Sequence, residues 1–197
     1  RDDCARDVRD GERDPDAVLL ERGLGEHDRD WEADCGEGGD GDTGTLESLP
    51  ESGDEEYIQD VEQFESQGRE HVPGEVNYER TPPLSGSHSS RATSAGFYEE
   101  GRILENLVHS LEHGAVVIYY DEANLTDESE ASLRAWAGQK DGRWQSIIVA
   151  PNPSTNPEAD YVVTAWRTRL YMDSYDARTV HAFLSEFIGR GPENPVR

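Results

Sequence analysis

The sequence predicts an α+β domain in which a small, mostly buried sheet is covered by helices in the chain order αβαββα. Two observations carry this expectation. Apolar residues recur at helical spacing in three segments, which is typical of helices that bury one face. Between them lie short runs that are apolar throughout, such as Ala115 to Tyr120, which is typical of strands buried on both sides. We therefore expect helices layered on a sheet with the strand at 115–120 in its centre.

The boundaries of the elements follow from local signals. Gly114 ends the first helix. Asp127 with Glu130 opens the second, and Asp176 caps the third. The predicted elements, in order, span residues 103–113, 115–120, 127–138, 146–150, 161–172 and 176–188. Upstream, the stretch 71–101 is rich in Pro, Gly and Ser, which predicts a long ordered loop.

The composition of the chain changes near residue 70. The part before this point holds 25 acidic and 7 basic side chains, and its first segment is too rich in Asp, Glu and Gly to bury a core. We expect three parts, namely an acidic Gly/Asp-rich extension at 1–53, an amphipathic connecting helix at 54–70 and a folded domain at 71–193.

The charge of the whole chain is strongly negative. It has 43 acidic against 18 basic residues and a net charge of -25. Such a surface repels phosphate backbones and anionic membranes, which argues against nucleic acid and lipid headgroups as partners and favours cations. At molar salt the screening length falls to about 3 Å and removes most of the self-repulsion. We therefore interpret the composition as an adaptation to high salt, as in a halophile.

Several features predict a location outside the cytoplasm. The chain begins at Arg1 and not at methionine, which suggests that an export signal was removed. A disulfide between Cys4 and Cys35 would stabilise the extension by about 3 to 4 kcal/mol; two free thiols in a reducing compartment are the alternative. No stretch approaches the roughly 18 apolar residues of a membrane span.

Four histidines are the candidate site. His109 and His113 stand four residues apart on the first predicted helix, which turns both imidazoles to one side. The apolar stripe of that helix lies on the other side, so neither is expected in the core; a solvated polar face is the alternative. His71 and His88 lie in the preceding loop. If this loop folds back over the helix, four imidazoles, or three and a water, converge on one metal ion.

The region around these histidines carries three motifs in order. They are PPLSGSH at 82–88, GFYE at 96–99 and LVHSLEHGAVVI at 107–118. Together with HVP at 71–73 and the segment 170–192, they closely resemble the family known as domain of unknown function 3105 over about residues 69–193. The resemblance implies bacterial and archaeal proteins that are usually exported or tethered to a membrane, and it implies no settled activity. The chain departs from the family at four positions. It has Leu84 where the family tends to have threonine and Ser87 where the family tends to have proline. It has Ser89 in place of an aromatic residue and Arg167 in place of glycine.

The ligand types favour copper, with zinc second. No cysteine lies near the four histidines, so metals that bind imidazole are expected, and affinity at a nitrogen site peaks at Cu²⁺. Met172 could add a soft ligand, but its place in a strand favours a core role. The sequence therefore predicts an extracytoplasmic transition-metal protein that uses His71, His88, His109 and His113 without catalytic turnover.

Two other functions remain open. The motif at 109–113 also fits H-x-x-E-H, in which two histidines bind zinc and the glutamate, here Glu112, activates water. Such a hydrolase needs a third acidic ligand, for which Glu186 is the candidate on the last helix. The second alternative is an extracellular structural or interaction protein that forms a homo-oligomer or filament through its N-terminal extension. His27 and His181 are interpreted as surface residues.

Overall fold

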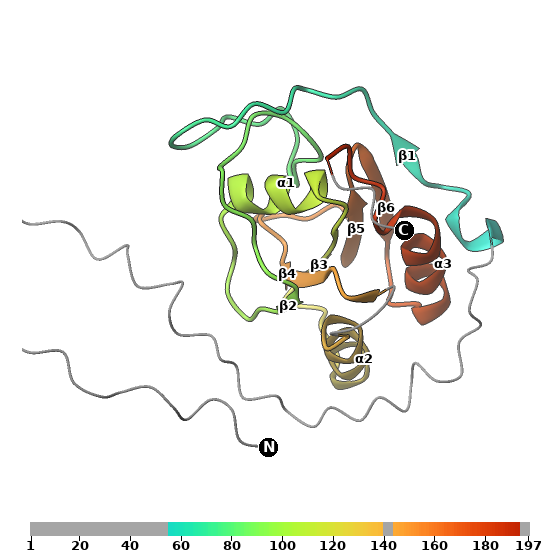
Figure 1. Ribbon diagram of the computed structural model, residues 1–197. Helices are drawn as coiled ribbons and strands as arrows, with labels where there is room; N and C mark the ends of the chain where they lie inside the picture. Colours follow the sequence, from blue (N-terminus) through green and yellow to red (C-terminus); the bar gives the residue numbers. More distant parts are fainter. Residues whose placement is uncertain (1–54, 140–143, 194–197) are drawn as a thin grey trace, which may run out of the picture. The chain divides into compact units, whose positions relative to one another are not determined.

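The structure is a computed structural model that describes residues 55–139 and 144–193. The predicted extension, its Cys4 and Cys35 pairing and His27 lie outside the described residues. The described part is an α+β fold, as predicted, with a six-stranded sheet of order β1-β6-β5-β3-β4-β2 (Figure 1). In chain order its elements are η2 (Glu55–Ile58), β1 (Glu62–Gln63), β2 (Gly96–Phe97), α1 (Leu104–Glu112), β3 (Val116–Tyr120), α2 (Asp127–Ala137), β4 (Ile147–Pro151), β5 (Tyr161–Ala165), β6 (Thr168–Met172) and α3 (Ala177–Phe187).

The strand β3 lies in the middle of the sheet, which confirms the expectation for this apolar run. It pairs in parallel with β4 and antiparallel with β5, with Val117 opposite both Ile148 and Thr164. All five residues of β3 are buried. Because side chains alternate along a strand, Val116 and Ile118 face one side of the sheet and Val117 the other. A strand covered on both sides accounts for the unbroken apolar sequence.

Helices cover both faces of the sheet (Figure 1). On one face, Leu107 and Leu111 of α1 pack with Val117 and Ile148. On the other face a larger apolar cluster joins residues of α2 and α3 to the sheet, and it includes Met172, whose predicted core role is confirmed. Fully burying one leucine, valine or methionine side chain stabilises a fold by about 1.5 to 3 kcal/mol. The helix α1, which carries His109 and has His113 as its C-cap, therefore covers its face of the sheet apart from α2 and α3.

The prediction of a connecting helix at 54–70 is wrong. A short 3-10 helix, η2, ends at Ile58, and the chain then extends into β1 at the edge of the sheet. Ile58 and Val61 pack on the core, so the apolar spacing reflects this short turn and not a long helix. Glu62 of β1 accepts two hydrogen bonds from the guanidinium of Arg169 on β6, at 3.0 and 2.8 Å. Pairing with β6 therefore sets the conformation of this segment, although the spacing of its apolar residues predicts a helix.

The long strand predicted at 161–172 is two strands joined by a tight turn. Ala165 pairs with Thr168, and Arg167 in the turn has φ of 64°. This left-handed conformation is disfavoured for most residues but not for glycine. Arg167 stands at a position where the family that the sequence resembles tends to have glycine. The remaining boundaries agree within a residue or two, although Thr126 with Ser129, and not Asp127 with Glu130, forms the capping box of α2.

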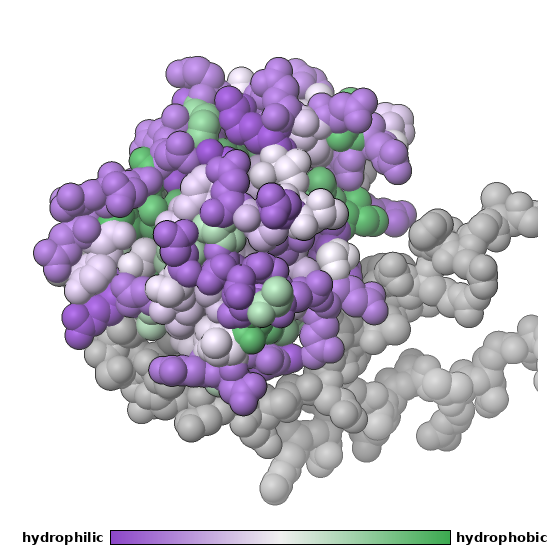
Figure 2. Space-filling model, turned by 180° about the vertical axis from the view of Figure 1, so that it is seen from behind, coloured by the Kyte–Doolittle hydropathy of each residue, from purple (hydrophilic) through white to green (hydrophobic). Residues whose placement is uncertain are grey.

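The surface of the described part is polar. Figure 2 shows mainly hydrophilic residues on the face seen from behind, with small separate hydrophobic areas. Among the described residues, Ile103 is the exposed large hydrophobic side chain. No helix of the described ranges is long and apolar enough to cross a membrane.

Replacing Gly114 by alanine should destabilise the protein by more than about 2 kcal/mol, because two penalties combine. Gly114 has φ of +89°, and an added Cβ would lie 2.8 Å from the Cα of Gly189. Chemical denaturation measures the loss. Gly74 is the matched control, since it has φ of +91° but open space around its Cβ position, so Gly74→Ala should cost only about 1 to 2 kcal/mol. Equal losses in the two variants would contradict this packing account.

Candidate metal centre

The two loop histidines are placed side by side by backbone pairing. The Val72 amide donates to the His88 carbonyl at 2.8 Å, and the His88 amide donates to the Glu70 carbonyl at 3.0 Å. His71 and His88 thereby form an isolated parallel bridge. Residues 17 positions apart in the sequence become direct neighbours.

The segment that carries His88 is fixed from several sides. The Tyr78 hydroxyl donates to the Ser87 carbonyl at 2.9 Å, and the Ser85 hydroxyl accepts from the Gln67 amide at 3.0 Å. Gly86 has φ of +124°, and a Cβ there would lie 3.3 Å from the Tyr78 ring. The conformation of Gly86 and its close contact with Tyr78 both favour glycine at this position.

The third histidine comes from α1 and is covered by the loop. His109 points away from the sheet, as helical spacing predicts, yet its exposed fraction is only 7%. The cover is the segment after His88, whose Ser89 carbonyl accepts from His109 Nδ1 at 2.7 Å. Farther along, the Thr93 amide donates to the Ser110 hydroxyl at 2.8 Å. The loop therefore lies against the polar face of α1.

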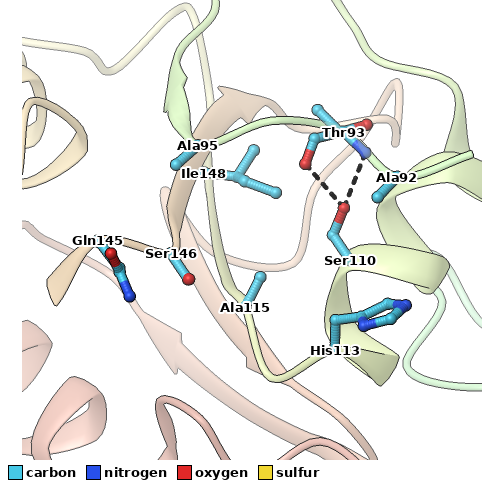
Figure 3. Close-up of a pocket in the computed structure, with 9 residues that line it drawn as sticks. All are labelled: Ala92, Thr93, Ala95, Ser110, His113, Ala115, Gln145, Ser146 and Ile148. Atoms are coloured by element: carbon cyan, nitrogen blue, oxygen red, sulfur yellow. Dashed lines mark hydrogen bonds between the residues drawn. The ribbon is translucent and has the colours of Figure 1, made fainter. Parts of the chain in front are cut away.

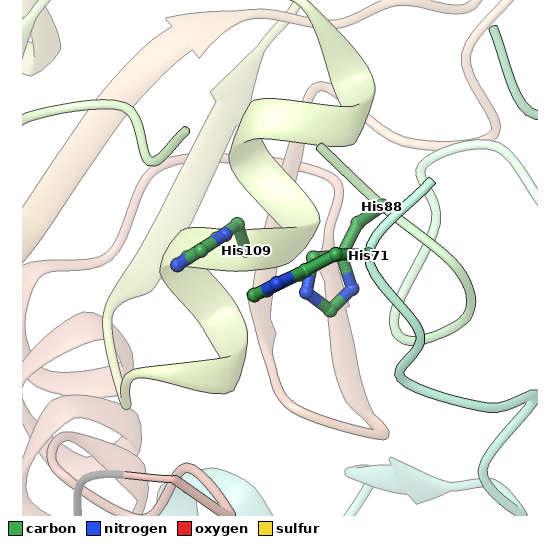
Figure 4. Close-up of side chains that lie close together, drawn as sticks. All are labelled: His71, His88 and His109. Atoms are coloured by element: carbon green, nitrogen blue, oxygen red, sulfur yellow. The ribbon is translucent and has the colours of Figure 1, made fainter. Parts of the chain in front are cut away.

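The three imidazoles of His71, His88 and His109 converge (Figure 4). Each offers a nitrogen within 4.8 Å of the other two. The rings of His71 and His109 are nearly parallel, with centroids 4.9 Å apart, and His88 stands edge-on to both. Three imidazoles from three segments form a candidate ligand set for a transition metal.

Two backbone carbonyls set the protonation of the buried rings. His88 Nδ1 lies 2.8 Å from the Gly86 carbonyl, as His109 Nδ1 lies beside that of Ser89. A carbonyl only accepts, so each Nδ1 carries the proton and each Nε2 presents a lone pair in the neutral ring. A hydrogen bond of this kind commonly orients histidines that bind metals.

The surroundings of His109 favour its neutral form. Burial lowers the pKa of His109 below its usual value, and the nearby imidazoles of His113, His88 and His71 lower it further, while the hydrogen bond to Ser89 raises it. The net shift is downward. A neutral imidazole is the form that binds a metal ion.

The fourth predicted ligand, His113, lies at the edge of the cluster. Its Nε2 is 2.7 Å from His109 Nε2, and its side chain is 41% exposed. It does not belong to the group of three whose nitrogens all lie within 4.8 Å. Glu193, near the C-terminus, lies 3.9 Å away from it. His113 therefore extends the site toward solvent.

A pocket of about 170 Å³ opens beside His113 (Figure 3). Small side chains such as Ala95 and Ala115 line much of it. The Ser110 hydroxyl in its wall donates to the Thr93 carbonyl at 2.9 Å, so that hydroxyl is already engaged. Of the residues that line the pocket, His113 is the one whose side chain suits a metal.

The sequence assigns Glu112 only the water-activating role of the hydrolase alternative and no role as a ligand. Glu112 is fully buried, and its Oε2 lies 2.9 Å from His88 Nε2. Its position, three residues after His109 on α1, is the signal that could have placed it with the histidines. The late-helix candidate Glu186 is instead half-exposed and paired with Arg190.

The surface interpretation of His181 is wrong. Its exposed fraction is 4%, and its ring contacts Trp136 and Trp144 with centroids 6.1 and 5.5 Å away. The imidazole packs at the border of the apolar stripe of α3 because two large indoles extend over it. His181 is not one of the three grouped histidines.

The fold and the histidine cluster define an α+β protein with a candidate transition-metal centre between a loop and a helix. The chain belongs to the family described as Protein of unknown function (DUF3105), which matches residues 71–197. This confirms the resemblance drawn from the motifs. No curated protein and no solved structure matches the chain.

At pH 6.5, we expect the ring of His109 to be mainly neutral and protonated at Nδ1, because its pKa lies below 6.5 and the Ser89 carbonyl accepts from Nδ1. Nitrogen-detected NMR of the metal-free protein distinguishes the two neutral tautomers and the imidazolium. His109→Gln assigns the signal by its disappearance. A ring protonated mainly at Nε2, or mainly charged at this pH, would contradict the assigned geometry.

Proposed function

We propose that the protein binds a transition-metal ion, copper in preference to zinc, through His71, His88 and His109, with His113 as a fourth ligand, and that it does so without catalytic turnover. The observation that carries this proposal is the convergence of three imidazoles from three segments. Two of them have their Nδ1 protons engaged by carbonyls, which leaves Nε2 for a metal. Nitrogen ligands favour copper among the divalent first-row metals.

The distances support a shared ion. A metal held about 2.0 to 2.1 Å from two nitrogens leaves them about 2.9 Å apart at a right angle and at most about 4.2 Å apart when opposite. His109 and His113 Nε2 are 2.7 Å apart, and His71, His88 and His109 each offer a nitrogen within 4.8 Å of the other two. Side-chain shifts of less than about 1 Å would bring the grouped nitrogens to coordination distances.

Binding is favoured over hydrolysis by the position of Glu112. A general base must reach the water that it activates. The Glu112 side chain is fully buried and faces His88. The expected third zinc ligand of an H-x-x-E-H hydrolase, Glu186, pairs with Arg190.

The charge of the protein and its proposed location fit a cation ligand. A net charge of -25 raises the local concentration of cations, although high salt weakens this attraction. We place the protein outside the cytoplasm, where copper is not kept scarce by chaperones. This location is supported by the family resemblance and is part of the proposal.

Calorimetric titration of the tag-free protein with Cu²⁺ and with Zn²⁺ tests the proposal. Elemental analysis after dialysis then measures how much metal remains bound. We expect one tightly bound ion per chain and higher affinity for Cu²⁺. His109→Ala should weaken binding by more than about 100-fold, since even outer-sphere partners of ligands contribute 10- to 100-fold.

His27→Ala is the matched control, because it removes one histidine outside the proposed site. It should leave the affinity unchanged. Absence of bound metal in the wild-type protein, or equal affinities of the His109 and His27 variants, would overturn the proposed function.

A further inference from the structure

We infer that Glu112 is itself a metal ligand, so that the site combines imidazoles with a carboxylate and selects divalent ions over Cu⁺. This inference rests on the proposed metal-binding function and specifies its ligand set. It assigns to Glu112 a role different from that of a water-activating base.

The contact between Glu112 and His88 is unusual for two buried side chains. Both side chains are fully buried, with Oε2 and Nε2 only 2.9 Å apart. The Nδ1 proton of His88 is donated to the Gly86 carbonyl, so in the neutral ring Nε2 has a lone pair and no proton. A fully buried carboxylate is thus held directly against the one ring nitrogen of His88 that the Gly86 carbonyl does not engage.

Among the described residues, the atoms of this contact have no hydrogen-bond partner. Within the described part of the chain, His88 Nε2 and both carboxylate oxygens of Glu112 are buried without a hydrogen-bond partner. Buried carboxylates are normally paired with donors or coordinate metals. A proton held between Nε2 and Oε2 would satisfy this one contact and leave Oε1 without a partner. A cation can take one or both oxygens.

The separation matches that of two ligands on one ion. With metal–ligand bonds of about 2.0 to 2.1 Å, two atoms at a right angle around a metal lie about 2.9 Å apart. The Nε2 and Oε2 atoms have this separation. An ion could therefore bind both atoms without changing the distance between them.

The helix places the carboxylate on the correct side. Relative to His109, Glu112 and His113 stand at i+3 and i+4, which lie on one face of an α-helix. The opposite face holds Leu107 and Leu111 in the core. The helix therefore presents the carboxylate of Glu112 next to His109, and both side chains contact residues of the covering loop.

The ligand chemistry then determines the oxidation state. Carboxylate oxygen is a hard, anionic ligand, which favours divalent ions, whereas Cu⁺ prefers sulfur. Met172 packs in the apolar cluster with α2 and α3, on the face of the sheet opposite α1. Within the described residues no sulfur is therefore available at the site, and Cu²⁺ or Zn²⁺ is the expected occupant.

The variant Glu112→Gln tests this inference, because it keeps the size of the side chain and removes the anionic ligand. Competition with chelators gives the affinities for Cu²⁺, Zn²⁺ and Cu⁺. We expect Cu²⁺ and Zn²⁺ to bind about 100-fold more weakly or worse, and Cu⁺ to change by less than about threefold. The electron paramagnetic resonance spectrum of bound Cu²⁺ should also shift.

Glu186→Gln is the matched control, since it neutralises a glutamate on α3 that pairs with Arg190. It should change neither the affinities nor the spectrum. Wild-type levels of Cu²⁺ and Zn²⁺ binding in Glu112→Gln, with an unchanged Cu²⁺ spectrum, would overturn the inference but leave the proposed function intact. Absence of metal binding by the wild-type protein would overturn both.

If Glu112→Gln loses its fold, as judged by circular dichroism, the wild-type protein decides. Infrared difference spectra before and after one equivalent of Zn²⁺ report on carboxylate stretching. A shifted carboxylate band in wild type that persists in Glu186→Gln supports coordination by a carboxylate other than Glu186, as the inference expects for Glu112. No shift would overturn the inference.

Discussion

The whole site depends on a loop that lies against the polar face of one helix. Two hydrogen bonds, from the imidazoles of His88 and His109 to the carbonyls of Gly86 and Ser89, join ligand orientation to backbone conformation. If the loop moved, His71 and His88 would leave the helix and His109 would become exposed. Orientation by backbone carbonyls is typical of ligands whose geometry is set before the metal binds.

Much of the fold could be predicted because its signals are local. The strand at Val116–Tyr120 is buried on both faces and therefore reads as an unbroken apolar run. Asp176 and Gly114 mark a helix start and a helix end by their backbone requirements. The sequence could name His71, His88 and His109 as candidates because they lie in the motifs of the loop and of α1, and the structure brings these three together. Sequence alone could not establish that the loop folds back.

The features that could not be predicted depend on contacts distant in sequence. The segment at Glu62 becomes a strand because β6 offers an edge and Arg169 offers a cation, and neither is visible in local spacing. His181 is buried because Trp136 and Trp144 cover it. Glu112 is buried against His88, a loop residue 24 positions earlier in the sequence. A buried carboxylate without a donor is visible only in three dimensions.

We propose that the cluster is a mixed imidazole and carboxylate site on a strongly acidic protein. X-ray absorption spectroscopy of the copper-loaded protein tests this claim most directly. It should show at least three nitrogen or oxygen neighbours at about 2.0 Å with imidazole scattering. His109→Ala should reduce that scattering. A sulfur neighbour, or a shell of oxygen without imidazole scattering, would contradict the account.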